Sequence, residues 1–376
     1  MTSGPLSLRA LNRALLDRQL LLRPAVPPAA GDRSAQVIET VEHLVGLQAQ
    51  APFPPYYGLW SRLDGFRPGD LAGLLTGRRV VRVALMRGTI HLVSAPDCLA
   101  LRPALQPVLD RALRATFGRR LAGVDLAALA AAGRILVEEK PRTFSDLGRE
   151  LAGHWPQHQP DALAQGVRAL VPLVQVPPRA VWGASGPAAH TSAEAWLGRP
   201  MPAGISLESL VTRYLAAFGP ATTADVQAWS GLTRLGEIVG RLRPGLRTFR
   251  GEQGAELFDL PDAPRPDPDI PAPVRFVPEF DNLILAHADR ARVLSEPHRQ
   301  RINARANSFP GSVLIDGFVG GIWKIARTRA AAALTVELFE PTSAQVTHEV
   351  SAEGHRMLGF AAPDADDHDV RFGPLP

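Results

Sequence analysis

Three prolines within residues 52–55 constrain the fold most, because they follow directly on an amphipathic segment. Pro52 disfavours helical geometry at the residue before it, and the next two prolines argue against a resumed helix. We therefore predict a helix over Ser34–Gln50, with Gln48 and Gln50 in its last turn. Both amides can then face one cavity, or they can satisfy the free carbonyls of the helix end. The buried stripe consists of Val37, Val41, Leu44, Val45 and Leu47.

Helical patterns followed by β-rich, glycine-broken patterns occur three times along the chain. This order is typical of winged helices, in which the hairpin is the wing. The pattern predicts winged helices at 1–98, 99–202 and 203–262. The first hairpin lies in Val80–Val93 and turns at Gly88. The second is expected to use strands near 174–176, 180–183 and 188–191, and the third spans 246–260 after a basic, recognition-type helix.

A proline-rich segment at 261–273 predicts an extended linker and a domain boundary. Beyond it, β-branched residues dominate 274–277, 313–326 and 333–339, which predicts a C-terminal β-barrel over 274–376. Asp316 is expected at a turn, and Asp281 is expected to cap or buttress this domain. The predicted fold class is α+β, with tandem winged-helix domains followed by the barrel.

The charge distribution favours either a polyanion-binding face or a solvated surface. The net charge is only +4 although the pI is about 9.8, and lysine occurs only at Lys140 and Lys324. A GC-rich genome accounts for that arginine bias without functional pressure. Acidic residues collect in the tail at 364–369. The arginines cluster in two places, Arg241, Arg243, Arg247 and Arg250, and then Arg290, Arg292, Arg299, Arg301 and Arg305.

Several classes of protein and site are disfavoured. The sequence has no apolar run long enough for a membrane span and no signal core, so we expect a cytoplasmic, nucleoid-associated protein. The single Cys98 excludes an internal disulfide and reads as a small buried residue. No HExxH, P-loop, dinucleotide or GxSxG pattern occurs, so we expect no metal and no cofactor.

Five short motifs in order indicate a family. They are Leu47-Gln-Ala-Gln50, Met86-Arg-Gly-Thr-Ile-His-Leu-Val93, Trp196-Leu-Gly198, Pro278-Glu-Phe-Asp281 followed by Asp289-Arg290, and Val313-Leu-Ile-Asp-Gly-Phe-Val-Gly-Gly-Ile-Trp323. With this spacing the chain resembles the AlkZ/YcaQ family of winged-helix DNA glycosylases over nearly its whole length. That family includes enzymes that protect antibiotic producers from their own DNA-alkylating products. Related members carry Gln-apolar-Asp, so Gln50 places the chain nearer the antibiotic-resistance branch.

The resemblance implies that Gln48 and Gln50 are catalytic. An amide cannot take up a proton at neutral pH, but it can hold a water by donating and accepting hydrogen bonds. That suffices when the departing base is a cationic N7-alkylguanine or N3-alkyladenine, because bond cleavage neutralises the ring. The implied function is monofunctional hydrolysis of N-glycosidic bonds in double-stranded DNA carrying alkylpurine lesions. Bulky natural-product adducts and interstrand crosslinks are the expected targets of this monomeric protein.

Other residues are candidates for DNA or lesion contact. His91 can instead be a histidine satisfied within the hairpin, and Arg87 can be a surface charge. A non-catalytic winged-helix DNA-binding regulator and a scaffold for protein contacts are the alternative functions. The Gln-Ala-Gln motif favours the enzyme, because a regulator has no use for two amides beside a wing. The candidates are Arg87, Thr89, His91, Arg290, Arg299 and Arg301.

Overall fold

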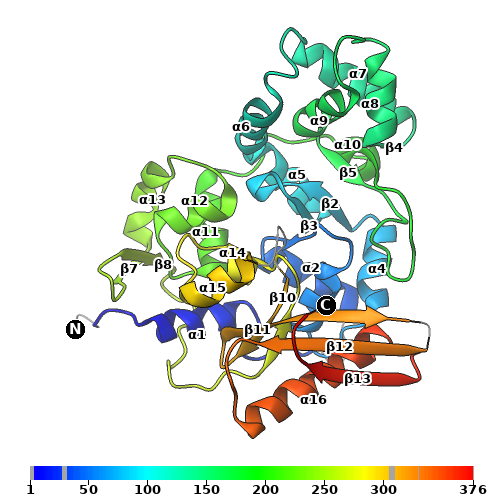
Figure 1. Cartoon of the computed structure of the whole chain (residues 1–376). Helices are drawn as coiled ribbons and strands as arrows, with labels where there is room; N and C mark the ends of the chain where they lie inside the picture. The colour runs from blue at the N-terminus through cyan, green and yellow to red at the C-terminus, as the bar shows by residue number, and fades with distance from the viewer. Residues whose placement is uncertain (1–3, 28–31, 305–309, 329, 376) are drawn as a thin grey trace.

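The computed structural model describes residues 4–27, 32–304, 310–328 and 330–375, and its class is α+β, as predicted (Figure 1). The helices are α1 (Leu8–Arg18), α2 (Arg33–His43), α3 (Pro54–Trp60), α4 (Pro68–Thr76), α5 (Ala95–Ala104), α6 (Gln106–Phe117), α7 (Leu126–Glu139), α8 (Phe144–Ala152), α9 (Pro160–Leu170), α10 (Ala193–Leu197), α11 (Leu207–Phe218), α12 (Thr223–Ser230), α13 (Gly236–Leu242), α14 (Asn282–Leu285), α15 (Glu296–Asn303) and α16 (Ala344–Ala361). The 3₁₀ turns are η1 (Met86–Gly88) and η2 (Arg243–Gly245).

In the described parts of the chain the strands belong to three sheets. They are β1 (Leu47–Gln48), β2 (Val80–Ala84), β3 (Ile90–Ser94), β4 (Arg142–Thr143), β5 (Leu173–Gln175), β6 (Ala189–Ser192), β7 (Arg247–Arg250), β8 (Glu256–Asp259), β9 (Arg275–Val277), β10 (Gly311–Ile315), β11 (Phe318–Arg327), β12 (Ala331–Leu338) and β13 (Asp367–Phe372). The first sheet has the order β1-β3-β2-β5-β6-β4. Because β2 pairs with β5, the strands of the first two segments form one continuous sheet.

The predicted helix over 34–50 is wrong at its C-terminal end. α2 ends at His43, and the chain turns back at Val45 and Gly46, which both have positive φ. The amide of Val45 donates to the carbonyl of Glu42, and that of Gly46 donates to the carbonyl of Val41. These are the two bonds of a Schellman motif. A Cβ at Gly46 would lie 2.7 Å from Cγ1 of Val93, so glycine allows the next residues to join β3 as strand β1.

Two further local predictions are wrong. Pro54 and Pro55 do not prevent a helix but begin one, because α3 places them in its first turn, where the missing N–H costs nothing. The expected strand at 180–183 is a turn, and β5 pairs with β6 directly. The third segment matches its prediction closely, with α11, α12 and α13 followed by the β7-β8 hairpin. Cys98 is buried, as expected.

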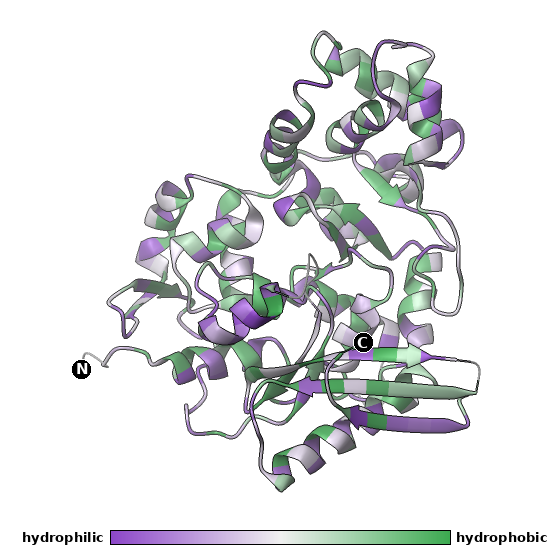
Figure 2. Ribbon diagram, viewed as in Figure 1, coloured by the Kyte–Doolittle hydropathy of each residue, from purple (hydrophilic) through white to green (hydrophobic). Residues whose placement is uncertain are grey.

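The C-terminal strands form a sheet of order β13-β12-β11-β10-β9, with Asp316 at the β10–β11 turn, as predicted (Figure 1). Two elements were not predicted, the long helix α16 and the strand β13 within the acidic tail. β13 is mostly hydrophilic in Figure 2, in keeping with its place at the sheet edge. Closure of this sheet into a barrel, and the division into four domains, stay predictions.

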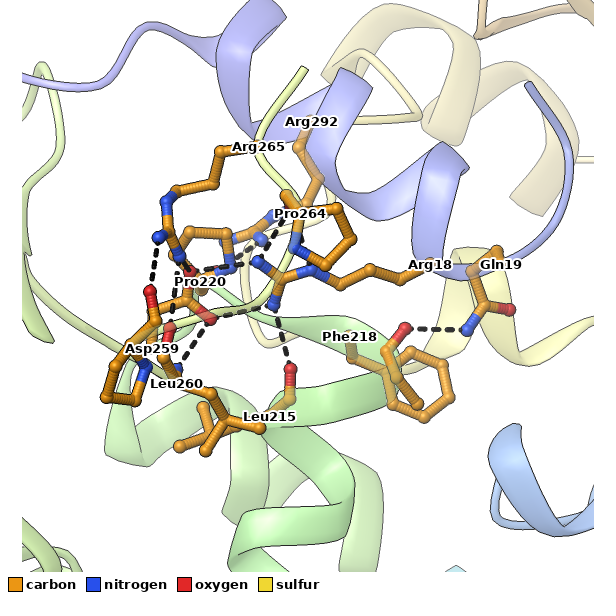
Figure 3. Close-up of polar contacts among 12 residues, drawn as sticks. Arg18, Gln19, Leu215, Phe218, Pro220, Asp259, Leu260, Pro264, Arg265 and Arg292 are labelled. Atoms are coloured by element: carbon orange, nitrogen blue, oxygen red, sulfur yellow. Dashed lines mark hydrogen bonds and ion pairs between the residues drawn. The ribbon is translucent and has the colours of Figure 1, made fainter. Parts of the chain in front are cut away.

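The arginines of α1 donate hydrogen bonds to backbone carbonyls of the segment 261–273. Arg18 forms a buried two-point ion pair with Asp259, at 2.7 and 2.9 Å, and donates to the carbonyl of Pro264 (Figure 3). Arg9 and Arg13 donate to the carbonyls of Pro268 and Ile270. The half-buried Arg9 and the buried Arg13 and Arg18 therefore join the first helix to the segment that leads into the C-terminal sheet. Within the described ranges, no helix combines the length and hydrophobicity needed to cross a membrane.

Candidate active site at the edge of the first sheet

The candidate site lies where the short edge strand β1 pairs with β3. Gln48 is directly opposite His91, and directly opposed residues of an antiparallel pair point to the same face of a sheet. Gln50 lies two residues further on, in the bend just beyond β1, where its side chain contacts the backbone of β3 at Ile90. Gln48 is only 7% exposed, whereas Gln50 is exposed. The two amides thus lie at and just beyond the edge strand β1, one buried and one exposed, and not at a helix end.

Each glutamine oxygen already accepts one hydrogen bond from the protein. Oε1 of Gln48 accepts from Nη2 of Arg87 at 2.6 Å, and Oε1 of Gln50 accepts from the backbone N–H of Ile90 at 3.2 Å. Both donors lack any acceptor capacity, so they define which end of each amide faces them. The NH₂ groups of both side chains are consequently directed away from these two donors.

Arg87 lies in the η1 turn of the first hairpin, in a left-handed conformation with φ of 56°. Its Nη1 donates to the carbonyl of Trp229 at 2.7 Å, and its Nη2 donates to Oδ1 of Asn282 at 3.1 Å as well as to Gln48. All three acceptors are uncharged. Burial, and then the nearby charge of Arg290, lower the pKa of Arg87 to about 10. The guanidinium is therefore charged at neutral pH.

The η1 turn is packed tightly between two other segments. A Cβ on Gly231, the residue that ends α12, would lie 3.1 Å from Cα and 3.2 Å from N of Arg87. Arg168 of α9 donates to the carbonyl of Gly88 at 2.9 Å, and the Thr89 hydroxyl donates to the carbonyl of Met86 at 3.0 Å. These contacts hold a left-handed non-glycine residue in place, a strain typical of functional sites.

His91 is fully buried on β3. Its Nδ1 lies 3.1 Å from the carbonyl of Thr89, an acceptor, so Nδ1 carries the proton. Nε2 is then an unprotonated acceptor, and it has no partner among the described residues. Burial, and then the charge of Arg87, lower the pKa of His91 to about 3. The imidazole is therefore neutral at physiological pH and cannot act there as a general acid.

Comparison with known proteins identifies the family. The sequence matches the family described as "DNA glycosylase AlkZ-like" over residues 41–360. The chain belongs to this family. The structure is similar to that of Streptomyces sahachiroi DNA glycosylase AlkZ, with a TM-score of 0.75, 18% sequence identity, and coverage of 99% of this chain and 100% of that one. No curated protein sequence matches significantly. At this identity the similarity shows a shared mixed α+β fold.

In this AlkZ-like chain, the arginines of the second cluster differ in their surroundings. Arg290 is half-buried, and its pKa is lowered by burial and by Arg299. Arg299 is half-buried and pairs with Glu296 at 2.7 Å, whereas the exposed Arg301 contacts Glu337 at 3.4 Å and packs on the ring of Phe339. Since Arg290 also lowers the pKa of Arg87, the charges of Arg87, Arg290 and Arg299 lie near one another. Arg305 lies outside the described residues.

The other clustered arginines are largely committed to protein contacts. Arg292 is buried beside Asp225, with a nitrogen–oxygen distance of 3.8 Å. Arg241 and Arg243 are exposed and form ion pairs of 2.6 Å with Glu208 and Glu256. Burial makes Arg292 unavailable to a polyanion, whereas Arg241 and Arg243, like Arg299, would exchange a surface ion pair for a phosphate contact.

Asn282 is a residue of the site that the sequence analysis missed, whereas Asp281 beside it was expected to act as a cap or buttress. Asn282 is buried and bridges Arg87 to the carbonyl of Gly46, to which its Nδ2 donates at 3.3 Å. Asp281 caps α14 and forms a buried ion pair with Arg62 at 2.9 Å, which holds Asn282 in place. The motif Pro278–Asp281, which ends one residue earlier, was the available signal. Among the described residues, no group of three histidine, cysteine or acidic side chains is placed to bind a metal ion.

Proposed function

We propose that this member of the AlkZ-like family is a monofunctional DNA glycosylase that hydrolyses the N-glycosidic bond of cationic N7- or N3-alkylpurines. The observation that carries the proposal is the pair of glutamines on one strand edge, each with its oxygen fixed by a protein donor. Fixed amides beside a neutral histidine provide hydrogen bonds without proton transfer. Such a site suits a leaving base that is already activated by its own charge.

The charge of the site supports a DNA substrate. The guanidinium of Arg87 donates hydrogen bonds to three neutral protein acceptors. Arg290 lowers the pKa of Arg87, which indicates a second guanidinium nearby. The charge of Arg87, whose three hydrogen-bond acceptors are neutral, favours binding of an anion. The phosphates of a DNA strand supply that anion, and we propose Arg290 and Arg299 as residues that contact them.

In the proposed reaction, a water held by Gln48 and Gln50 attacks C1′ of the lesioned nucleotide. A new C1′–O bond forms, and the electron pair of the C1′–N bond leaves with the base. The ring of an N7-alkylguanine becomes neutral in this step, so the base needs no proton. The water gives up its proton to solvent, and the products are the free base and an abasic site.

Bulky natural-product adducts, including interstrand crosslinks, are the substrates that we propose for this enzyme. Gln50 at the mouth of the site is exposed, and the β1 edge next to it carries no further strand of the described sheet. An open site of this kind leaves room for a large substituent on the purine. Removal of such adducts would give self-resistance to a DNA-alkylating antibiotic.

The test is incubation of the protein with a duplex that contains one N7-methylguanine, followed by detection of the abasic site through alkaline strand cleavage. We expect cleavage at the lesion only. A winged-helix regulator would instead bind intact duplex without releasing any base, and that outcome would refute the proposal.

A further inference from the structure

We propose that Arg87 and Asn282 are positioning residues that hold the Gln48 amide with its oxygen turned inward, so that Gln48 serves the bound substrate as a hydrogen-bond donor. This inference rests on the proposed glycosylase function and specifies how one of its two glutamines works.

The orientation of Gln48 follows from the chemistry of its partner. Arginine can only donate, so the atom 2.6 Å from Nη2 of Arg87 must be the oxygen of the amide. The bond is short and charge-assisted, which makes it stronger than an ordinary hydrogen bond between neutral groups. Reversal of the amide would bring an NH₂ group against a guanidinium in a buried place. The outward end of Gln48 is therefore its NH₂ group.

Arg87 can orient Gln48 because it is itself fixed on two further sides. The carbonyl of Trp229 comes from α12, and Oδ1 of Asn282 comes from the start of α14. Asn282 in turn donates to the carbonyl of Gly46, two residues before Gln48. The hydrogen bonds thus form a path from Gly46, just before β1, through Asn282 and Arg87 to Gln48 on β1.

The charge of Arg87 also changes what Gln48 can do. A cation bonded to the carbonyl oxygen draws electron density from the amide, which strengthens its N–H donors and weakens the oxygen as an acceptor. Gln48 is then suited to donate into one lone pair of the lytic water, which leaves the other lone pair free to attack C1′. Acceptance of the water's protons is left to other groups, among which the exposed Gln50 is the candidate.

An isosteric variant tests the donor role. Gln48→Glu keeps an oxygen for Arg87 but replaces the outward NH₂ group by a second acceptor. We expect its single-turnover excision of N7-methylguanine to fall at least about tenfold, as far as in Gln48→Ala, with no loss of thermal stability. Excision within about twofold of the wild-type rate would overturn the donor assignment.

A double-mutant cycle tests the positioning role. Asn282→Ala should lower the single-turnover rate about tenfold with unchanged affinity for the duplex, and Asn282→Asp, which keeps an acceptor for Arg87, should restore most of it. In the Gln48→Ala background, Asn282→Ala should have less than about a twofold effect. Additive effects of the two substitutions would refute action through Gln48. Asn303→Ala, at the end of α15, is the matched surface control.

A spectroscopic readout separates this inference from the glycosylase function. In protein labelled with ¹⁵N-glutamine, the side-chain resonances of Gln48 are those lost in Gln48→Ala. They should shift in Asn282→Ala and stay unchanged in Asn303→Ala. If wild-type protein releases no base while this shift is observed, the proposed function fails and the positioning network stands. If the shift is absent, the network fails.

Discussion

The burial of His91 leads to a definite prediction about pH. Because its pKa is about 3, only about 0.3% of the imidazole is protonated at pH 5.5, and tenfold less at pH 6.5. A mechanism that used this proton would accelerate about tenfold for each unit of acidification. We expect the single-turnover rate of N7-methylguanine release to be constant between pH 5.5 and 8.5, and the neutral lesion hypoxanthine to stay bound to its sugar.

The measurement compares wild type with His91→Ala and with His190→Ala. His190 is a matched control because it is also buried in the first sheet, on β6, and its pKa is lowered to about 4 by burial. Both variants lose a buried imidazole, so rates are normalised to the folded fraction. A well-placed general acid contributes typically about 10²–10⁴-fold. Hypoxanthine release that rises towards low pH and disappears only in His91→Ala would refute the charge-activated mechanism. Loss of N7-methylguanine release at every pH would make His91 a contact residue for the lesion.

Three further predictions concern catalysis, binding and stability. Gln48→Ala and Gln50→Ala should each lower the rate of base excision by roughly ten- to a thousandfold at unchanged DNA affinity, and Gln345→Ala, at an exposed glutamine, is the control. Wild-type excision rates in both folded variants would refute the catalytic role of the two glutamines. Affinity for duplex DNA should fall with salt concentration, at a log–log slope of about −0.9 per phosphate neutralised, and a flat response would exclude binding through phosphates. Arg290→Ala should reduce that slope by about one, whereas Arg241→Ala, which removes an arginine paired with Glu208, should leave it unchanged. Burial lowers the pKa of His91, His190 and His287 from the unfolded value of about 6.5 to about 3, 4 and 3. Because the unfolded chain binds protons at these histidines before the folded chain does, the free energy of unfolding decreases as the pH falls from about 6.5 towards the folded pKa values. At pH 5.5 the three together should cost about 4 kcal/mol in the free energy of unfolding, measured by urea denaturation, and an equal stability at pH 5.5 and 7.5 would contradict this.

The sequence predicted elements whose signals are local. The end of α12 at Gly231 and the hairpin turn at Gly88 could be predicted, because glycine is common where the backbone takes a positive φ that other residues avoid. The end of α2 was missed because Val45, a β-branched residue, takes the left-handed position usually held by glycine. α16 was missed because Gly354 weakens its helical signal, although that glycine lets the helix lie close to Leu334 and Val370.

The candidate site was predictable only in part, for a related reason. Gln48 and Gln50 were found through their motif, and their placement beside His91 follows from strand pairing that the helix prediction had excluded. Arg87 forms hydrogen bonds with Asn282, 195 residues away in the sequence, and with Trp229, 142 residues away. Contacts at such separations depend on how whole segments pack, so no local pattern of residues shows them.

The attachment of α1 to distant segments has a consequence for how the chain folds as it is made. Arg13 donates to the carbonyl of Asp316 at 3.0 Å, 303 residues further along, and its Nε donates to Ile270. During synthesis the first helix therefore cannot form these hydrogen bonds until most of the polypeptide has emerged from the ribosome. Domains commonly fold in order from the N-terminus, but here the N-terminal helix completes its contacts late. Nascent chains from which Ile270 and Asp316 have not yet emerged should leave α1 open to proteases, and chains long enough to expose both residues outside the ribosome should protect it.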